Sequence, residues 1–294
     1  MAQVPPHARK GAFSCIAMED NIKYAAVFVS NSRQVCYNRR SIGHNDLIME
    51  VMNMQVHIFR NAEEVAKAAA MIFAAEISRK PDAVIGLATG STPVPTYQEL
   101  IRLNREGLID FSKVRSYNLD EYIGLEGTHE CSYRYFMNDQ LFNHINIDMA
   151  NTHVPCGTGA DHEADAAAYD AAIEAAGGVD LQLLGIGHNG HIGFNEPNTH
   201  FVYPTNIIDL TESTINANAR YFDSANDVPR QAISMGIGTI MSARRVILLA
   251  TGKGKAPAIA RAVKGQIDPD MPASILRAHQ NCQFLLDEEA ASEL

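Results

Sequence analysis

Short apolar runs alternate with segments of helical periodicity from Met54 to the end of the chain. Continuous apolar runs such as Ala83–Ala88 are typical of strands buried on both faces of a sheet. Strands are expected at 55–59, 83–88, 114–119, 152–154, 179–184, 206–209, 246–250 and 282–286. Helices are expected at about 61–77, 94–104, 132–142, 161–176 and 255–263. This alternation predicts an α/β fold: one domain with an open, doubly wound, mostly parallel sheet and helices on both faces.

The first predicted helix has clear signals at its N-terminus and along its buried face. Asn61 is a plausible N-cap, and Glu64 stands at the capping-box position three residues later. Five apolar residues then recur at helical spacing. They are Val65, Ala69, Ile72, Phe73 and Ile77.

Residues 1–53 lack this organisation. They carry six Lys/Arg and four Asp/Glu, so their net charge is +2 and the remainder of the chain carries −10 − 2 = −12. The apolar run Ala25–Val29 is shorter than the ~7–15 residues of a secretory signal, and Glu19 and Asp20 argue against a transit peptide. We therefore expect residues 1–53 to be a poorly ordered extension outside a catalytic domain at 54–294.

Composition narrows the possible partners. The net charge of −10 disfavours nucleic acid and anionic membranes, and no run reaches the ~18 apolar residues of a membrane helix. The cysteines at 15, 36, 131, 156 and 282 show neither a zinc nor a disulfide spacing. This usage fits a reducing cytoplasm. An anionic substrate would need a local cluster of positive groups in such an acidic chain.

Three polar loops each follow a predicted strand, at the sheet edge where α/β proteins bind ligands. The first contains Thr89, Gly90, Ser91 and Thr92. The glycine lets the backbone approach a ligand, and the hydroxyls and the following helix N-terminus can bind an anion. The Gly-Lys-Ser/Thr ending of a Walker motif is absent, which disfavours a nucleoside triphosphate. An ordinary strand-to-helix turn is the alternative.

The second loop carries Asp120 and Glu121 at the end of a predicted strand. A carboxylate in such a partly desolvated place can act as a general base, because burial raises its pKa towards neutrality. The alternative is that Asp120 only caps the next segment.

The third loop, Gly185–Pro197, carries His188, Asn189, His191 and Glu196. A histidine beside carboxylate and amide groups can transfer protons near neutral pH, whereas His188 is better explained as a histidine held by hydrogen bonds. The loop also matches the dinucleotide fingerprint, with an acid about 20 residues further on, but prolines interrupt the helix that this motif requires. A metal site is a weaker alternative, because the spacing matches no zinc pattern.

Two cations are candidates for completing the site. Arg220 lies in the segment 218–222 and Lys255 follows the predicted strand 246–250, although a single Arg or Lys usually lies on the solvated surface. Two charge-assisted hydrogen bonds, each of about 1.5–3 kcal/mol, together with a helix N-terminus could hold a phosphate group.

The segments GLATGSTP, NLDEYIGL, LLGIGHNGHIGFNEP, ANARYF and GKGKA, in this order and spacing, resemble the glucosamine-6-phosphate deaminase family over about residues 54–294. The resemblance implies conversion of glucosamine 6-phosphate and water to fructose 6-phosphate and ammonia. It also implies that no redox cofactor or metal is needed.

The resemblance also assigns roles to residues. It implies that Asp120 moves a proton from the second sugar carbon to the first, and that His191 opens the pyranose ring with Glu196 and Asn189 assisting it. Arg220 and Lys255 are the implied phosphate ligands, together with the hydroxyl loop of Ser91 and Thr92. Residues 210–233 around Arg220 resemble a lid over the sugar.

In one respect the chain departs from many members of the family, which carry aspartate at the position of Asn189. An amide can neither accept a proton nor stabilise an imidazolium by charge, so either Glu196 carries that role alone or the pKa of the histidine is lower. A shorter subgroup of the family also uses asparagine here. The chain ends soon after its last predicted strand, from which we expect an unregulated monomer or small homo-oligomer. The rival hypotheses are a 6-phosphogluconolactonase-like hydrolase and a non-catalytic sugar-phosphate sensor.

Overall fold

The computed structural model describes residues 33–34 and 54–294, apart from residue 223. The prediction that 1–53 form a separate extension falls almost entirely outside the described residues and stays a prediction. Arg33 and Gln34 form β1, which pairs antiparallel with β2. Among the described helices, none has the length and apolar character needed to cross a bilayer.

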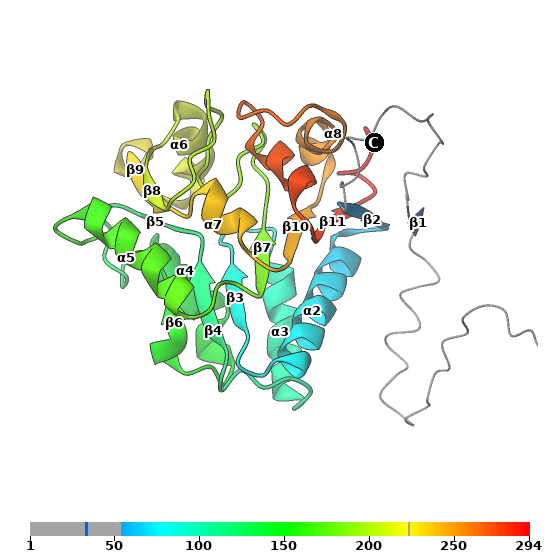
Figure 1. Ribbon diagram of the computed structural model, residues 1–294, viewed down its shortest axis with the longest axis horizontal. Helices are drawn as coiled ribbons and strands as arrows, with labels where there is room; N and C mark the ends of the chain where they lie inside the picture. Colours follow the sequence, from blue (N-terminus) through cyan, green and yellow to red (C-terminus); the bar gives the residue numbers. More distant parts are fainter. Residues whose placement is uncertain (1–32, 35–53, 223) are drawn as a thin grey trace, which may run out of the picture. The chain divides into compact units, whose positions relative to one another are not determined.

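A mostly parallel sheet forms the centre of the fold (Figure 1), which confirms the predicted architecture. In the described part of the chain its order is β1-β2-β11-β10-β7-β3-β4-β6, and every pair beyond β1·β2 is parallel. The parallel strands are β2 Gln55–Phe59, β11 Cys282–Asp287, β10 Val246–Ala250, β7 Leu181–Leu184, β3 Val84–Leu87, β4 Arg115–Asn118 and β6 Thr152–His153. All residues of β3, β7 and β10 are buried, as the continuous apolar runs of β3 and β10 predict.

The strand order reverses direction between β3 and β7. From β3 the chain moves outward through β4 to β6, whereas β7 lies on the other side of β3 and leads towards β10 and β11. The loops that leave the carboxyl ends of β3 and β7 therefore diverge. Such a switch point opens a crevice in which ligands bind in open α/β sheets.

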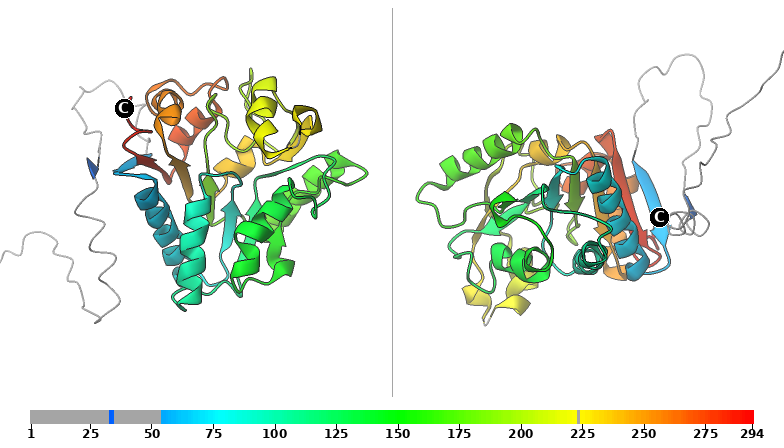
Figure 2. Two further views of the ribbon diagram at one scale, coloured as in Figure 1. Left: turned by 180° about the vertical axis from the view of Figure 1, so that it is seen from behind. Right: turned by 90° about the horizontal axis from the view of Figure 1, so that it is seen from below.

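Helices cover both faces of this sheet (Figure 2). α2 contacts α3 and the strands β2, β10 and β11, while Tyr169 of α5 packs against Tyr117 of β4. The helices are α2 Ala62–Arg79, α3 Val94–Arg105, α4 Tyr133–Gln140, α5 His162–Ala175, α6 Glu212–Asn218, α7 Ile237–Met241 and α8 Ala256–Lys264. The 3-10 segments are η1 Phe142–His144, η2 Met149–Asn151, η3 Ala219–Tyr221, η4 Ala225–Asp227, η5 Lys253–Lys255 and η6 Pro272–Ala278.

The N-terminus of α2 confirms the predicted cap and corrects the predicted capping box. Asn61 accepts a 3.0 Å hydrogen bond from the backbone N–H of Glu64. The Glu64 carboxylate binds the backbone N–H and the guanidinium of Arg60, one residue before the cap. The reciprocal bond to the N–H of Asn61 is absent, because the guanidinium draws the carboxylate away from it.

A second, antiparallel sheet was not predicted from the sequence. It consists of β5 Asp120–Tyr122, β9 Gln231–Ser234 and β8 Asn206–Asp209, in the order β5-β9-β8. The prediction of a strand at 206–209 is confirmed, but this strand pairs with β9 and not within the central sheet. With α6, it covers the upper ends of the central strands in Figure 1.

The second sheet has a small apolar core of its own. Its buried members are Tyr122, Phe194, Leu210, Ile215, Val228 and Ala232. Because this cluster joins β5, α6 and the loop after β7, it holds the segment 210–233 beside the carboxyl ends of the central strands.

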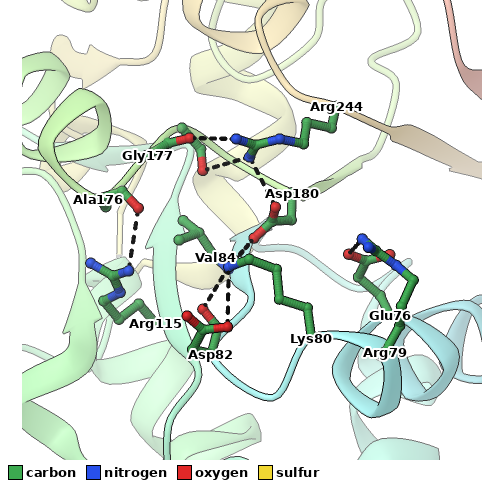
Figure 3. A network of polar contacts seen from close by, with 11 residues as sticks. Glu76, Arg79, Lys80, Asp82, Val84, Arg115, Ala176, Gly177, Asp180 and Arg244 are labelled. Atoms are coloured by element: carbon green, nitrogen blue, oxygen red, sulfur yellow. Dashed lines mark hydrogen bonds and ion pairs between the residues drawn. The ribbon is translucent and has the colours of Figure 1, made fainter.

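A polar network at the opposite ends of β3 and β7 fixes how these two strands start (Figure 3). Asp180, whose side chain is 2% exposed, accepts a 2.8 Å hydrogen bond from the N–H of Val84. The same carboxylate lies 3.1 Å from Nζ of Lys80 and 2.9 Å from a guanidinium nitrogen of Arg244. Since β3 and β7 flank the switch point, this network helps to position both of the loops that leave their far ends.

Candidate active site

A cavity of about 640 Å³ lies where the loops after β3, β4 and β7 meet. Nine of the ten residues predicted for the site line it: Thr89, Gly90, Ser91, Thr92, Asp120, Asn189, His191, Arg220 and Lys255. The tenth, Glu196, lies behind this lining and bonds to two of the residues that form it. The structure thus brings together the three loops and both cations that the sequence predicts.

The loop after β3 presents the N-terminus of α3 to the cavity. Gly90 has φ +98°, a left-handed conformation that disfavours other residues. The buried hydroxyl of Tyr97 is hydrogen-bonded to both backbone groups of Ala88, which fixes the end of β3. The N-cap position, Pro93, supplies no side-chain acceptor. The first turn of α3 therefore keeps backbone N–H groups for an anion.

Asp120 lies on β5, opposite Ser234 of β9. It is only 6% exposed but lines the cavity. Burial raises the pKa of its carboxyl to about 8, and the nearby Glu121 carboxylate adds to the shift. A group with this pKa can both accept and release a proton near neutral pH.

Glu121 has a different function from its neighbour, because successive residues of a strand point to opposite sides. Its carboxylate accepts hydrogen bonds from the backbone N–H groups of Tyr122, Tyr133 and Arg134, at 2.9, 2.8 and 2.9 Å. Tyr133 and Arg134 form the first turn of α4. Glu121 therefore holds the N-terminus of α4 against β5, a role that the sequence alone did not predict.

The loop after β7 forms a connected group of imidazole, amide and carboxylate. Asn189 donates a 2.6 Å hydrogen bond to Oε2 of Glu196 and accepts one of 3.2 Å from the backbone N–H of His191. Nδ1 of His191 lies 3.5 Å from the same carboxylate oxygen, which is an ion-pair contact and not a hydrogen bond. The ring packs against Gly187, where a Cβ atom would lie 2.3 Å from Cε1 of the imidazole.

Glu196 is ionised at neutral pH. Burial alone would raise the pKa of Glu196, but interactions with His191, Thr214 and Asn189 hold it at about 2. The Thr214 hydroxyl donates to Oε1 of this carboxylate. Glu196 can therefore stabilise a positive charge on the imidazole when His191 accepts a proton.

Lys255 and Arg220 supply positive charge from η5 and η3. Nζ of Lys255 donates a 2.6 Å hydrogen bond to the carbonyl of Ile186. Its pKa is lowered by burial and also by the charge of Arg220, so the two cations act on one another. Both line the cavity, where an anion would relieve their repulsion.

The alternatives for the loop after β7 are less well supported. No helix follows its glycines, since residues 188–205 contain none, and Asp209 lies exposed on β8 outside the cavity lining. This geometry excludes the dinucleotide motif. Among the described residues there is also no group of three or more His, Cys, Asp or Glu placed to hold a metal ion.

The prediction that hydrogen bonds hold His188 is wrong, since its ring bonds to no described residue.

An aromatic wall beside Asp120 was not predicted from the sequence. Tyr122 packs against Tyr133, Phe194 and Phe222, with ring centroids 4.8, 5.7 and 5.8 Å away. The Tyr122 hydroxyl accepts a 2.8 Å hydrogen bond from Nδ2 of Asn218 at the end of α6. Tyr122 and Asn218 stand within the NLDEYIGL and ANARYF segments, which was the only available signal. This contact fastens α6 over the cavity.

Comparison with known proteins agrees with this geometry. The family described as glucosamine-6-phosphate isomerases/6-phosphogluconolactonase matches residues 60–285. A glucosamine-6-phosphate deaminase from Clostridium perfringens is 53% identical over 241 residues, which are 82% of this chain and 100% of the relative. One from Shewanella woodyi is also 53% identical, over 82% of this chain and 91% of its own length.

Solved structures give the same result. A monomeric glucosamine-6-phosphate deaminase superposes with a TM-score of 0.80 and 46% identity, covering 81% of this chain and 99% of its own. The 6-phosphogluconolactonase of Thermotoga maritima has a TM-score of 0.63 at 18% identity, covering 80% and 100%, a likeness of fold alone. The chain therefore belongs to the family of glucosamine-6-phosphate isomerases and 6-phosphogluconolactonases.

Proposed function

We propose that this protein is a glucosamine-6-phosphate deaminase, which converts glucosamine 6-phosphate and water to fructose 6-phosphate and ammonia. The proposal is supported by relatives of that name that are 53% identical over nearly their whole length. The structural observation that carries it is a single cavity with three chemically distinct parts. These parts are a buried acid, an imidazole–carboxylate pair, and a group of hydroxyls and cations.

The hydroxyls and cations bind the phosphate in this proposal. Ser91 and Thr92 donate from the loop after β3, with the uncapped N-terminus of α3 behind them. Arg220 and Lys255 add charge-assisted hydrogen bonds. An acidic chain thereby gains a local site for a dianion.

His191 opens the pyranose ring. Its imidazole removes the proton of the anomeric hydroxyl and returns one to the ring oxygen, so the histidine ends as it began. Glu196, whose pKa is about 2, supplies the negative charge that stabilises the intermediate imidazolium. Asn189 fixes both partners by hydrogen bonds. An aspartate at position 189 is thus not required for charge compensation.

Asp120 then transfers a proton along the open sugar. It removes the proton from the second carbon and delivers it to the first, while one proton of the ammonium group passes to the aldehyde oxygen, which converts the open amino aldose to a ketose-level iminium ion. Water adds to that iminium ion at the second carbon, and the carbon–nitrogen bond breaks to release ammonia. The ammonium group of the bound sugar favours the ionised form of Asp120, because an opposite charge lowers a carboxyl pKa.

An assay for ammonia released from glucosamine 6-phosphate tests the proposal. Asp120→Asn should lower kcat by about 100-fold or more while substrate still binds. Asp139→Asn, which changes an exposed carboxyl of α4, is the matched control and should keep wild-type activity. Full activity of Asp120→Asn would contradict its role as the base.

Two parallel measurements separate the rival functions. Hydrolysis of 6-phosphogluconolactone without ammonia formation would favour the lactonase. Binding of the sugar without isotope exchange at its second carbon would favour the sensor. Neither rival has an observation in this cavity that specifically supports it.

Further expectations accompany this function. We propose that residues 210–233 close over the sugar as a lid, which excludes water and strengthens the electrostatic contacts. A monomer or small homo-oligomer is supported by the similar monomeric deaminase. No nucleic acid, membrane or cofactor is expected to take part. Cys156 and Cys282 are free thiols, consistent with the expected cytoplasmic location.

A further inference from the structure

His188 lines the edge of the cavity and has no hydrogen-bond partner among the described residues. Its side chain is exposed and lines the cavity between the loop after β7 and η5. A Cβ atom on Gly254 would lie 3.5 Å from Nε2 of the ring, so the imidazole is in contact distance of the loop that carries Lys255. No hydrogen bond joins the ring to a described residue. Both ring nitrogens are therefore available to a ligand.

The described groups whose charge acts on the His188 pKa are positive or able to become so. They are Lys255 of η5, His191 of the same loop and Arg220 of η3. The charge of Lys255 is the largest cause of a lowered His188 pKa, followed by burial and then by His191 and Arg220. With its pKa lowered in this way, the ring is mostly neutral at neutral pH. The same neighbours are those that would be drawn together around a phosphate.

We infer that His188 is a third cationic ligand of the substrate phosphate, beside Arg220 and Lys255, and that it takes up a proton from solvent when the dianion binds. This inference rests on the proposed function, since it concerns the phosphate end of the same cavity. A phosphate dianion between the three groups cancels the repulsion that keeps the ring neutral. The protonated ring then donates a charge-assisted hydrogen bond.

The pH dependence has a definite sign. In the free protein the ring is protonated only below its lowered pKa, and beside a dianion its pKa rises. At pH values between the His188 pKa of the free protein and that of the anion-bound protein, binding is accompanied by proton uptake, and the affinity gained from His188 increases as the pH falls. At pH values above the pKa of the bound protein, the ring is neutral with and without the anion and contributes only an ordinary hydrogen bond.

Kinetics of three variants test this inference. His188→Gln keeps a polar side chain but cannot become charged, and His188→Arg carries a permanent charge. His200→Gln changes an exposed histidine outside the cavity and serves as the control. The substrate phosphate itself titrates near pH 6, so each profile is compared with that of the wild type.

The His188→Gln substitution is expected to raise KM and to leave kcat unchanged. His188→Gln should raise KM about tenfold near pH 6 and by no more than about twofold near pH 8.5. His188→Arg should give a low KM at both pH values, because the charge of its side chain does not change with pH. Equal KM profiles for wild type and His188→Gln would overturn the inference, as would a loss in kcat at constant KM.

A binding measurement that needs no turnover separates this inference from the proposed function. Inorganic phosphate and fructose 6-phosphate are titrated into the full-length wild type while the His188 ring is followed by NMR. Its resonance should move to the protonated position between about pH 6 and 7 on addition of either anion. If it moves although no ammonia is formed from glucosamine 6-phosphate, the inference stands and the proposed function fails. If ammonia is formed and the resonance does not move, the inference fails alone.

Discussion

Replacing Asp120 by asparagine should stabilise the fold while it removes the activity. Asp120 is 6% exposed, and burial, followed by the charge of Glu121, raises the pKa of its carboxyl from 3.8 to about 8. An acid whose pKa is higher in the folded chain than in the unfolded chain does not change the unfolding free energy at pH values below its pKa in the unfolded chain. As the pH rises from that pKa to the pKa in the folded chain, the acid destabilises the fold increasingly. Above the pKa in the folded chain the destabilisation is constant.

The magnitude follows from these two pKa values. At pH 7, ionisation in the unfolded chain favours unfolding by about 4 kcal/mol relative to an uncharged side chain. The substituted amide recovers this energy, but the Asp120 carboxyl accepts no hydrogen bond from the described residues. A buried amide without partners costs about 1–3 kcal/mol. The expected net gain at pH 7 is therefore about 1–3 kcal/mol.

The decisive quantity is how this gain changes with pH. Urea unfolding of wild type and Asp120→Asn between about pH 5 and pH 9 gives the difference in unfolding free energy. It should grow by about 1.4 kcal/mol per pH unit up to pH 8 and then level off. Asp139→Asn should show no such slope. A difference for Asp120→Asn that stays constant over this range would refute the reasoning.

Three other substitutions test separate parts of the molecule. Asp180→Asn should lower the unfolding free energy measured in urea by about 1–3 kcal/mol with kcat unchanged, because a buried carboxylate loses its bonds to two cations and a backbone N–H. An unchanged midpoint of urea unfolding would contradict this. Asn218→Ala should raise KM about two- to tenfold in steady-state kinetics, because it removes the hydrogen bond from α6 to Tyr122. An unaltered KM would show that this bond does not hold the proposed lid. Asn189→Asp should move the acid limb of the pH profile of kcat/KM to higher pH, because a second carboxylate beside Glu196 raises the pKa values of both carboxyl groups. Superimposable profiles of wild type and variant would disprove this prediction.

The central sheet and its helices were predictable because their signals are local. The runs Ala83–Ala88 and Val246–Ala250 are long enough to identify buried strands, and Asn61 marks the start of α2 correctly. The second sheet has no comparable signal. β5 has three residues and continues almost directly from β4, and β9 becomes a strand only by pairing with Asp120–Tyr122 and Asn206–Asp209. Such pairing between distant segments cannot be read from periodicity.

The candidate site was predictable as far as side-chain chemistry and loop position determine it. Asp120, His191 and the hydroxyl loop follow strands whose carboxyl ends meet, so their convergence follows from the fold. The role of Glu121 depends on α4 folding back onto β5, which no local pattern specifies. The electrostatic surroundings of His188 likewise arise from η3 and η5, segments that lie far away in the chain.

The Glu121 carboxylate has a mechanical consequence for catalysis. It accepts hydrogen bonds from the first turn of α4, while Asp120, the residue before it in the same short strand, lines the cavity. The peptide bond between Asp120 and Glu121 therefore couples the proposed base to the helix that bears Tyr133 in the cavity wall. A ligand that tilts α4 cannot do so without displacing the proposed base as well. The distance between this proposed base and the substrate is thus set partly by a helix to which no chemical step is assigned.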